Sequence, residues 1–170
     1  MSTPPSDDEL WQAVVEAKRE MHRRQADFHH KAGSRPDILK AALAAGSGPW
    51  QRGAALDFLT ELSDDVPALL GDLVGLCLSH GWALAARQAI DSIPHDELLP
   101  LLEPLVMERL GSADDDEYRR LAELLAHVQA WELLSRLVGR ALDTDDPDTH
   151  EVAEDFTEWH GPMWLCKPNL

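Results

Sequence analysis

A pattern of apolar positions recurs three times along the chain at intervals of 32 residues. The segments LLGDLVGLCL (69–78), LLEPLVMERL (101–110) and LLSRLVGRAL (133–142) align without a gap. In each of them apolar residues occupy positions 1, 2, 5, 6 and 10, a spacing typical of a helix with two apolar faces. Since such a helix must pack against neighbours on both sides, we expect a continuous stack of helices.

A second set of helices alternates with these, and each of its members carries a central alanine. The segments GAALDFLTEL, LAARQAIDSI, RLAELLAHV and EVAEDFTEW are centred on Ala55, Ala86, Ala122 and Ala153. The alanines are 31, 36 and 31 residues apart, which indicates a short insertion near 111–117. An alanine at these positions lets two helix backbones approach closely, so we expect the four alanines to be buried.

The chain upstream of the repeats predicts a long helix over 6–31. Ser6 followed by Glu9 forms a capping-box pattern at its start, and acidic residues occupy its first turn. Apolar residues such as Trp11 and Phe28 follow at broadly helical spacing, and Gly33 ends the helix.

This organisation resembles the HEAT-repeat family of α-solenoids over about residues 36 to 160. The resemblance implies an all-α, right-handed solenoid of about three to four helix pairs in a single domain, 1–170. Its parts are an N-terminal capping helix at 6–31, a degenerate repeat at 36–45, three helix-pair repeats at 50–145, and a C-terminal cap and tail at 147–170. Members of this family often carry an aspartate–arginine pair between repeats.

Charge is distributed unevenly along the chain. Residues 1–52 carry a balance of +1, whereas residues 53–170 carry −17. Such an acidic body repels phosphate backbones and attracts basic partners, so we expect no nucleic-acid partner and a basic protein partner. No apolar run is long enough to span a bilayer, and MSTPPSDDEL is not a normal secretory signal. We therefore expect a cytoplasmic protein without a membrane partner.

The motifs that carry chemistry are weak. DTDDPDTHEVAE (143–154) places acids at four EF-hand ligand positions, but Pro147 and Asp148 stand where the loop and its sharp turn need other residues, so we expect an acidic loop before a helix. The histidines form no HExxH motif. A nucleophile elbow, a phosphate-binding glycine loop and an isolated acid/base pair are all lacking. The sequence therefore predicts a non-catalytic protein without metal or cofactor.

Two surfaces are candidates for binding a partner. The HEAT resemblance implies that the second helix of each pair lines the concave side, which gives a ligand face of Asp72, Leu76, Glu103, Glu108, Arg136 and Arg140. The second candidate is the aromatic tail with Trp159 and Trp164, because an exposed pair of tryptophans would form a binding hot spot. The alternative is that both tryptophans fold back and cover the last repeat.

These features indicate an acidic protein-binding module, and a sharper version is an inhibitor or immunity-type protein that blocks a basic enzyme. The alternative is an enzyme or ligand carrier with an anion pocket, served by Arg19, Arg23 and Arg24, between the N-terminal helix and the first repeats. Against that pocket, the three arginines can pair with acids on the same helix. The oligomeric state is left open, with self-assembly through an uncapped end as one route.

Overall fold

The computed structural model describes residues 4–165 of the 170-residue chain, and every regular element in that range is helical. The elements are α1 (Asp7–Lys31), α2 (Arg35–Leu43), α3 (Pro49–Glu61), the 3-10 helix η1 (Ser63–Asp65), α4 (Val66–Cys77), α5 (Ala83–Asp91), α6 (His95–Arg109), α7 (Asp115–His127), α8 (Trp131–Leu142) and α9 (Pro147–Leu165). The prediction of an all-α chain is confirmed.

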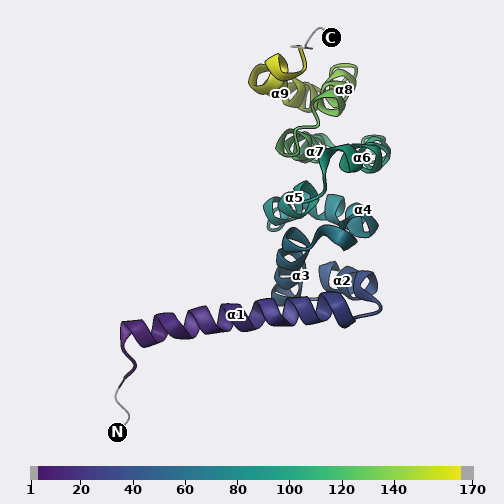
Figure 1. Ribbon diagram of the computed structural model, residues 1–170. Helices are drawn as coiled ribbons and strands as arrows, with labels where there is room; N and C mark the ends of the chain where they lie inside the picture. The colour runs from purple at the N-terminus through teal and green to yellow at the C-terminus, as the bar shows by residue number, and fades with distance from the viewer. Residues whose placement is uncertain (1–3, 166–170) are drawn as a thin grey trace.

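From α2 onward the helices stack in two columns along one axis (Figure 1). One column holds α3, α5, α7 and α9, and the other holds α2, α4, α6 and α8. Helices pack against their chain neighbours, as α8 does with α9, and against the next helix of their own column, as α3 does with α5. One apolar core therefore runs along the stack from Leu39 to Phe156.

The alanine column lies inside this core, as the sequence predicts. Ala55, Ala86, Ala122 and Ala153 are all buried, one on each of α3, α5, α7 and α9. Because these side chains are small, the helices of this column can approach their neighbours closely, and each added carbon at these positions would need space that the packing does not leave.

Two leucines of the repeated apolar pattern are exposed instead of packed. Leu101 on α6 is 41% exposed, although Leu69 and Leu133 in the same column are buried. Helix α6 packs mainly on α4 and buries Leu98, Leu102 and Val106, whereas Leu101 lies outside that buried side of the helix. The other is Leu142, the last residue of α8.

Helix α1 leaves one end of the stack and projects away from it (Figure 1). Its capping box is present: the Ser6 hydroxyl accepts from the Glu9 amide at 3.3 Å, and the Glu9 carboxylate accepts from the Ser6 amide at 2.7 Å. No residue of α1 is buried. Its C-terminal half meets the stack, where Phe28 packs edge-on against Phe58 with ring centroids 5.2 Å apart. The helix therefore covers the end of the stack with its last turns only.

Candidate functional site

The residues predicted to form a ligand face do share one column, on α4, α6 and α8, but several of them are paired within the chain. Arg136 lies 2.7 Å from the Glu103 carboxylate, and Lys40 of α2 lies 3.6 Å from that of Asp72. Leu76 is partly buried against the core. Together α2, α4, α6 and α8 carry seven acidic and five basic side chains, so the second-helix column is close to neutral.

The two other residues of that predicted face, Glu108 and Arg140, are exposed. Within residues 4–165 neither of them forms an ion pair. They lie on different helices, α6 and α8. The predicted face therefore contains both signs of charge and only a few groups that are available to a partner.

In the column of α3, α5, α7 and α9, two arginine–acid pairs join neighbouring helices of the column. Arg87 of α5 pairs with Glu123 of α7, and Arg119 of α7 lies 2.9 Å from Asp155 of α9. Both pairs join residues 36 positions apart. That common spacing is the sequence signal that could have located them, and these charges link helices within the chain.

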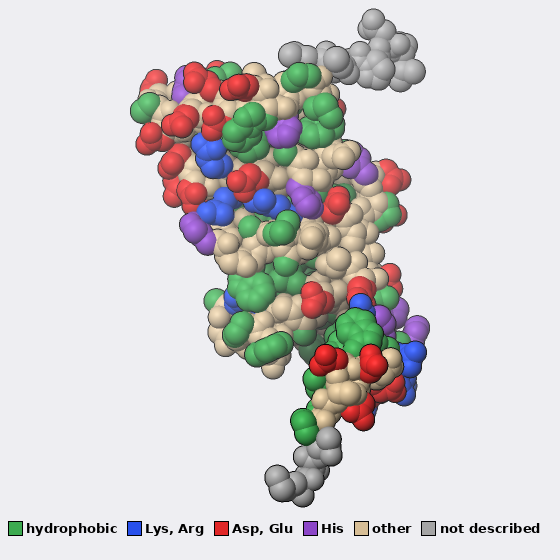
Figure 2. Space-filling view, turned by 90° about the vertical axis from the view of Figure 1, so that its left-hand side faces the viewer, with side chains coloured by type: hydrophobic (Ala, Val, Ile, Leu, Met, Phe, Trp, Pro, Cys, Tyr) green, Lys and Arg blue, Asp and Glu red, His purple; other side chains and the backbone are tan. Residues whose placement is uncertain are grey.

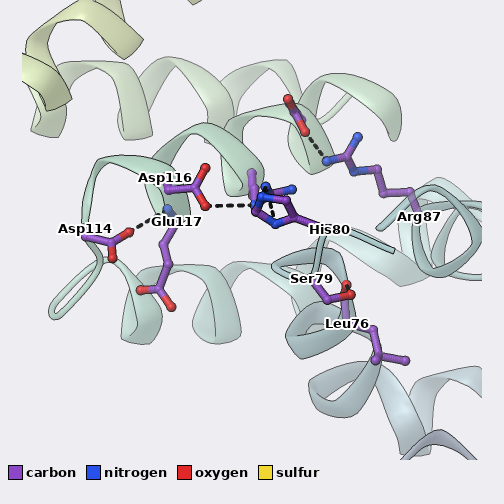
Figure 3. Close-up of polar contacts among 9 residues, drawn as sticks. Leu76, Ser79, His80, Arg87, Asp114, Asp116 and Glu117 are labelled. Carbon is purple, nitrogen blue, oxygen red and sulfur yellow. Dashed lines mark hydrogen bonds and ion pairs between the residues drawn. The ribbon is translucent and has the colours of Figure 1, made fainter. Parts of the chain in front are cut away.

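A third arginine of the body, Arg120 of α7, links His80 in the turn between α4 and α5 to Asp116 of α7; Figure 3 labels these two partners. Arg120 lies 3.2 Å from the Asp116 carboxylate and contacts His80 Nδ1 at 2.8 Å. In the same view Asp114 accepts the Glu117 amide at 2.9 Å and caps α7. Much of the charge at the start of α7 thus has a structural partner.

Acids without a basic partner gather at the C-terminal end of the stack. Residues 143–158 contain eight Asp or Glu and no Lys or Arg, and of these eight only Asp155 pairs with an arginine of the described residues. Figure 2 shows the acidic side chains crowded at this end, with a band of Lys and Arg below them. We define the C-terminal acidic face as the exposed Glu151, Glu154 and Glu158 of α9 together with Trp159 and Met163.

The two tryptophans of the predicted aromatic tail are placed differently. Trp159 is 58% exposed, and its ring contacts that of Phe156 in a tilted arrangement with ring centroids 5.4 Å apart. Trp164 is partly buried and packs against the core. Met163, four residues after Trp159 and on the same side of α9, is also exposed. The apolar part of this face is therefore Trp159 with Met163.

The acidic loop before α9 acts as a helix cap. Asp146 accepts from the Thr149 amide at 3.1 Å and from the Thr149 hydroxyl at 2.5 Å, and α9 begins at Pro147. The hydrogen bond from the Thr149 hydroxyl is the main cause that lowers the pKa of Asp146 below its ordinary 3.8. Within residues 4–165 no group of His, Cys, Asp and Glu is arranged to hold a metal ion.

This cap should be visible in the acid dependence of stability. Because the pKa of Asp146 is lowered in the folded chain, its ionised form stabilises the fold above pH 3.8, and that contribution is lost as the pH falls through the folded value. We expect Asp146→Asn to be less stable than the wild type at pH 7, and the difference to shrink towards pH 2. Urea unfolding of both proteins at several pH values measures it, and a constant difference would contradict the cap.

A groove of about 910 Å³ lies between the C-terminal half of α1 and helices α2 and α3. Its wall is mainly apolar and includes Met21, Phe28, Leu39, Trp50 and Phe58. The alternative function placed a pocket between these same elements, and of its three arginines Arg24 lines the groove. The apolar character of the wall was not predicted, because it depends on the angle at which α1 leaves the stack.

The arginines proposed for an anion pocket at this end are paired along α1. Arg19 lies 3.4 Å from Glu16, and Arg23 and Arg24 lie 3.0 and 2.8 Å from Glu20. These contacts agree with the structural interpretation of the three residues.

The chain matches no protein-family model, and comparisons with characterised proteins and with solved structures gave no match. In the part of the chain that the structure describes, no helix is both long and apolar enough to cross a membrane.

Proposed function

We propose that the helix stack is a right-handed α-solenoid of the HEAT-like kind, with three to four helix pairs. Two features support this. Alternate helices fall in two columns around one core. Arginine–acid pairs at Arg87 and Arg119 link neighbouring helices of one column, α5 with α7 and α7 with α9, as between-repeat pairs often do in that family.

We further propose that the protein is a non-catalytic binding module for a basic protein, and that the C-terminal acidic face is the contact surface. The observation that carries this proposal is the run of eight acids without a base over 143–158, beside the exposed Trp159 and Met163. An exposed tryptophan next to uncompensated charge combines the two elements of a specific charged interface, an apolar anchor and a polar surround.

The acids would act mainly on the rate and selectivity of association. A field of one sign steers a basic partner towards the face and weakens as salt rises. Trp159 would then be covered by the partner and limit dissociation. An inhibitor of a basic enzyme, such as a nuclease whose own active site attracts phosphate, needs this chemistry, because an acidic face competes for the same basic surface.

The second-helix column is the weaker candidate for the same function. Its charges nearly balance, and Glu103 is neutralised by Arg136. A basic partner would have to displace such intramolecular pairs, whereas Glu151, Glu154 and Glu158 form no ion pair among the described residues. The two columns can therefore be compared directly by equal changes in charge.

The test is capture of basic proteins from the lysate of the source cells by the immobilised protein, at about 0.1 M and about 1 M salt. We expect capture at low salt only. The triple variant Glu151→Lys, Glu154→Lys, Glu158→Lys should abolish it, and the double variant Trp159→Ala, Met163→Ala should weaken it at least about tenfold.

The matched control for charge is the triple variant Glu97→Lys, Glu103→Lys, Glu108→Lys on α6, and the control for the tryptophan is Trp50→Ala. Both controls should capture normally. If the α6 triple removes capture and the α9 triple does not, the contact lies on the second-helix column. If no basic protein is captured, the proposed function is wrong.

A further inference from the structure

The free half of α1 carries an apolar stripe that no other part of residues 4–165 covers. Leu10, Trp11, Val14 and Met21 are each between 44% and 63% exposed. Leu10, Val14, Met21 and Phe28 recur at intervals of four or seven residues, so they follow one side of the helix. Figure 1 shows this half projecting clear of the stack, and Figure 2 views it from near its N-terminal end.

The same stripe continues into the groove beside α3. Met21 and Phe28 belong both to the stripe and to the groove wall. Across the groove, Trp50 at the start of α3 is 90% exposed. An apolar helix laid along α1 in this groove would therefore cover the stripe, the groove wall and Trp50 at once, as in other helix-in-groove interfaces.

The charges along α1 specify which helix fits. Residues 7–17 contain four acids and no base, whereas residues 18–31 contain five Lys or Arg and two acids. Two copies of α1 that run antiparallel place the acidic half of each beside the basic half of the other. A parallel arrangement would instead place like charges together, which is unfavourable.

We propose that the occupant is α1 of a second copy of this chain, in a two-fold symmetric, antiparallel dimer. In the register centred near Arg19, Leu10 of each copy lies beside Phe28 of the other, and Ala17 lies beside Met21. Leu10, Trp11 and Val14 of one copy then fill the groove of the other, and the contact is the same on both sides, as a two-fold interface requires.

This arrangement also separates the acidic bodies. Each stack rises from the C-terminal end of its own α1, so the antiparallel pair holds the two stacks at opposite ends. A helix of 25 residues is about 37 Å long. That separation is several times the screening length of about 8 Å at physiological salt, so the two −17 bodies repel each other only weakly.

The apolar side chains are sufficient for an interface of this kind. Trp11 and Trp50 of both copies together can bury on the order of 600 Å² in the dimer. Leucine, valine and methionine side chains add to this, towards the roughly 1,200 Å² of a stable interface. A membrane surface is a poorer occupant, because the polar side of the free half is acidic and interfacial helices carry Lys and Arg there.

The experiment is the molar mass of the full chain by sedimentation equilibrium over a range of concentrations. We expect a monomer–dimer equilibrium. Trp11→Glu with Val14→Glu should raise the dimer dissociation constant by about 30-fold or more. Since no residue of α1 is buried, the variant should keep its helical circular dichroism and its thermal stability. The control Trp159→Glu, at the far end of the stack, should leave the dimer unchanged.

Three further variants test the antiparallel direction. Asp7→Lys, Asp8→Lys, Glu9→Lys should weaken the homodimer, and mixing this variant with Arg23→Glu, Arg24→Glu, Lys31→Glu should restore a heterodimer. Ala17→Cys with Met21→Cys, in a Cys166→Ser background, should cross-link through disulfides that neither single cysteine gives efficiently. A monomer at every concentration, a dimer that survives Trp11→Glu with Val14→Glu, or charge variants that do not pair when mixed would each overturn the proposal. Because these variants leave α9 intact, this result does not depend on capture of a basic partner.

Discussion

Replacing Leu69 by alanine should lower the free energy of unfolding by about 3 to 4 kcal/mol, whereas Leu101→Ala should lower it by less than about 1 kcal/mol. The two residues occupy the same position of the repeated pattern, 32 residues apart. Leu69 of α4 is 1% exposed and lies in the hydrophobic core. Its replacement removes buried apolar surface and also leaves a cavity. Leu101 is already in contact with water, so its loss leaves no closed cavity.

Chemical unfolding of both variants beside the wild type measures this difference. Leu133→Ala, in the same column and buried, is the positive control and should resemble Leu69→Ala. Equal costs for Leu69→Ala and Leu101→Ala would mean that Leu101 is also packed in the core, against its exposure in the structure.

Replacing Asp65 by alanine should lower the free energy of unfolding by about 3 kcal/mol, more than breaking any other single ion pair within residues 4–165. Asp65 is buried, and Arg35 donates to both of its carboxylate oxygens, at 2.7 and 3.2 Å. The same guanidinium donates to the carbonyl oxygen of His29 at 2.7 Å and so joins the end of α1 to the stack. The hydrogen bond that Arg35 donates to Asp65 raises the pKa of the arginine. A guanidinium is charged at neutral pH even without such a partner, so Asp65→Ala leaves Arg35 charged and unpaired at this position.

A double-mutant cycle with Arg35→Ala isolates the pair. We expect the double variant to cost clearly less than the two single variants added together, because each single change leaves a desolvated polar partner behind. Asp155→Ala is the comparison, since its pair with Arg119 is about one-third exposed on both sides and should contribute less than about 1 kcal/mol. A cost below about 1 kcal/mol for Asp65→Ala would contradict the role assigned to the buried pair.

The candidate binding surface was predicted only in part. The acidity of residues 53–170 and the prominence of Trp159 were evident in the sequence. The choice between columns was not, because it depends on which charges are neutralised by neighbours that are far away in the chain. Glu103 is 33 residues from Arg136, and Asp72 is 32 residues from Lys40. Trp159 and Trp164 differ because five residues of helix turn their side chains to different sides of α9.

The sequence by itself determined the helices of this protein. The cap formed by Ser6 and Glu9, the start of α9 at Pro147 and the buried column of alanines depend on residues close together or on a helical period, which are local properties. The tertiary structure alone decided how each helix is used. It left Leu101 exposed, directed α1 away from the stack and opened the groove at Trp50. The physical reason is that periodicity fixes which side of a helix is apolar, whereas the packing angles and distances between helices decide what covers that side.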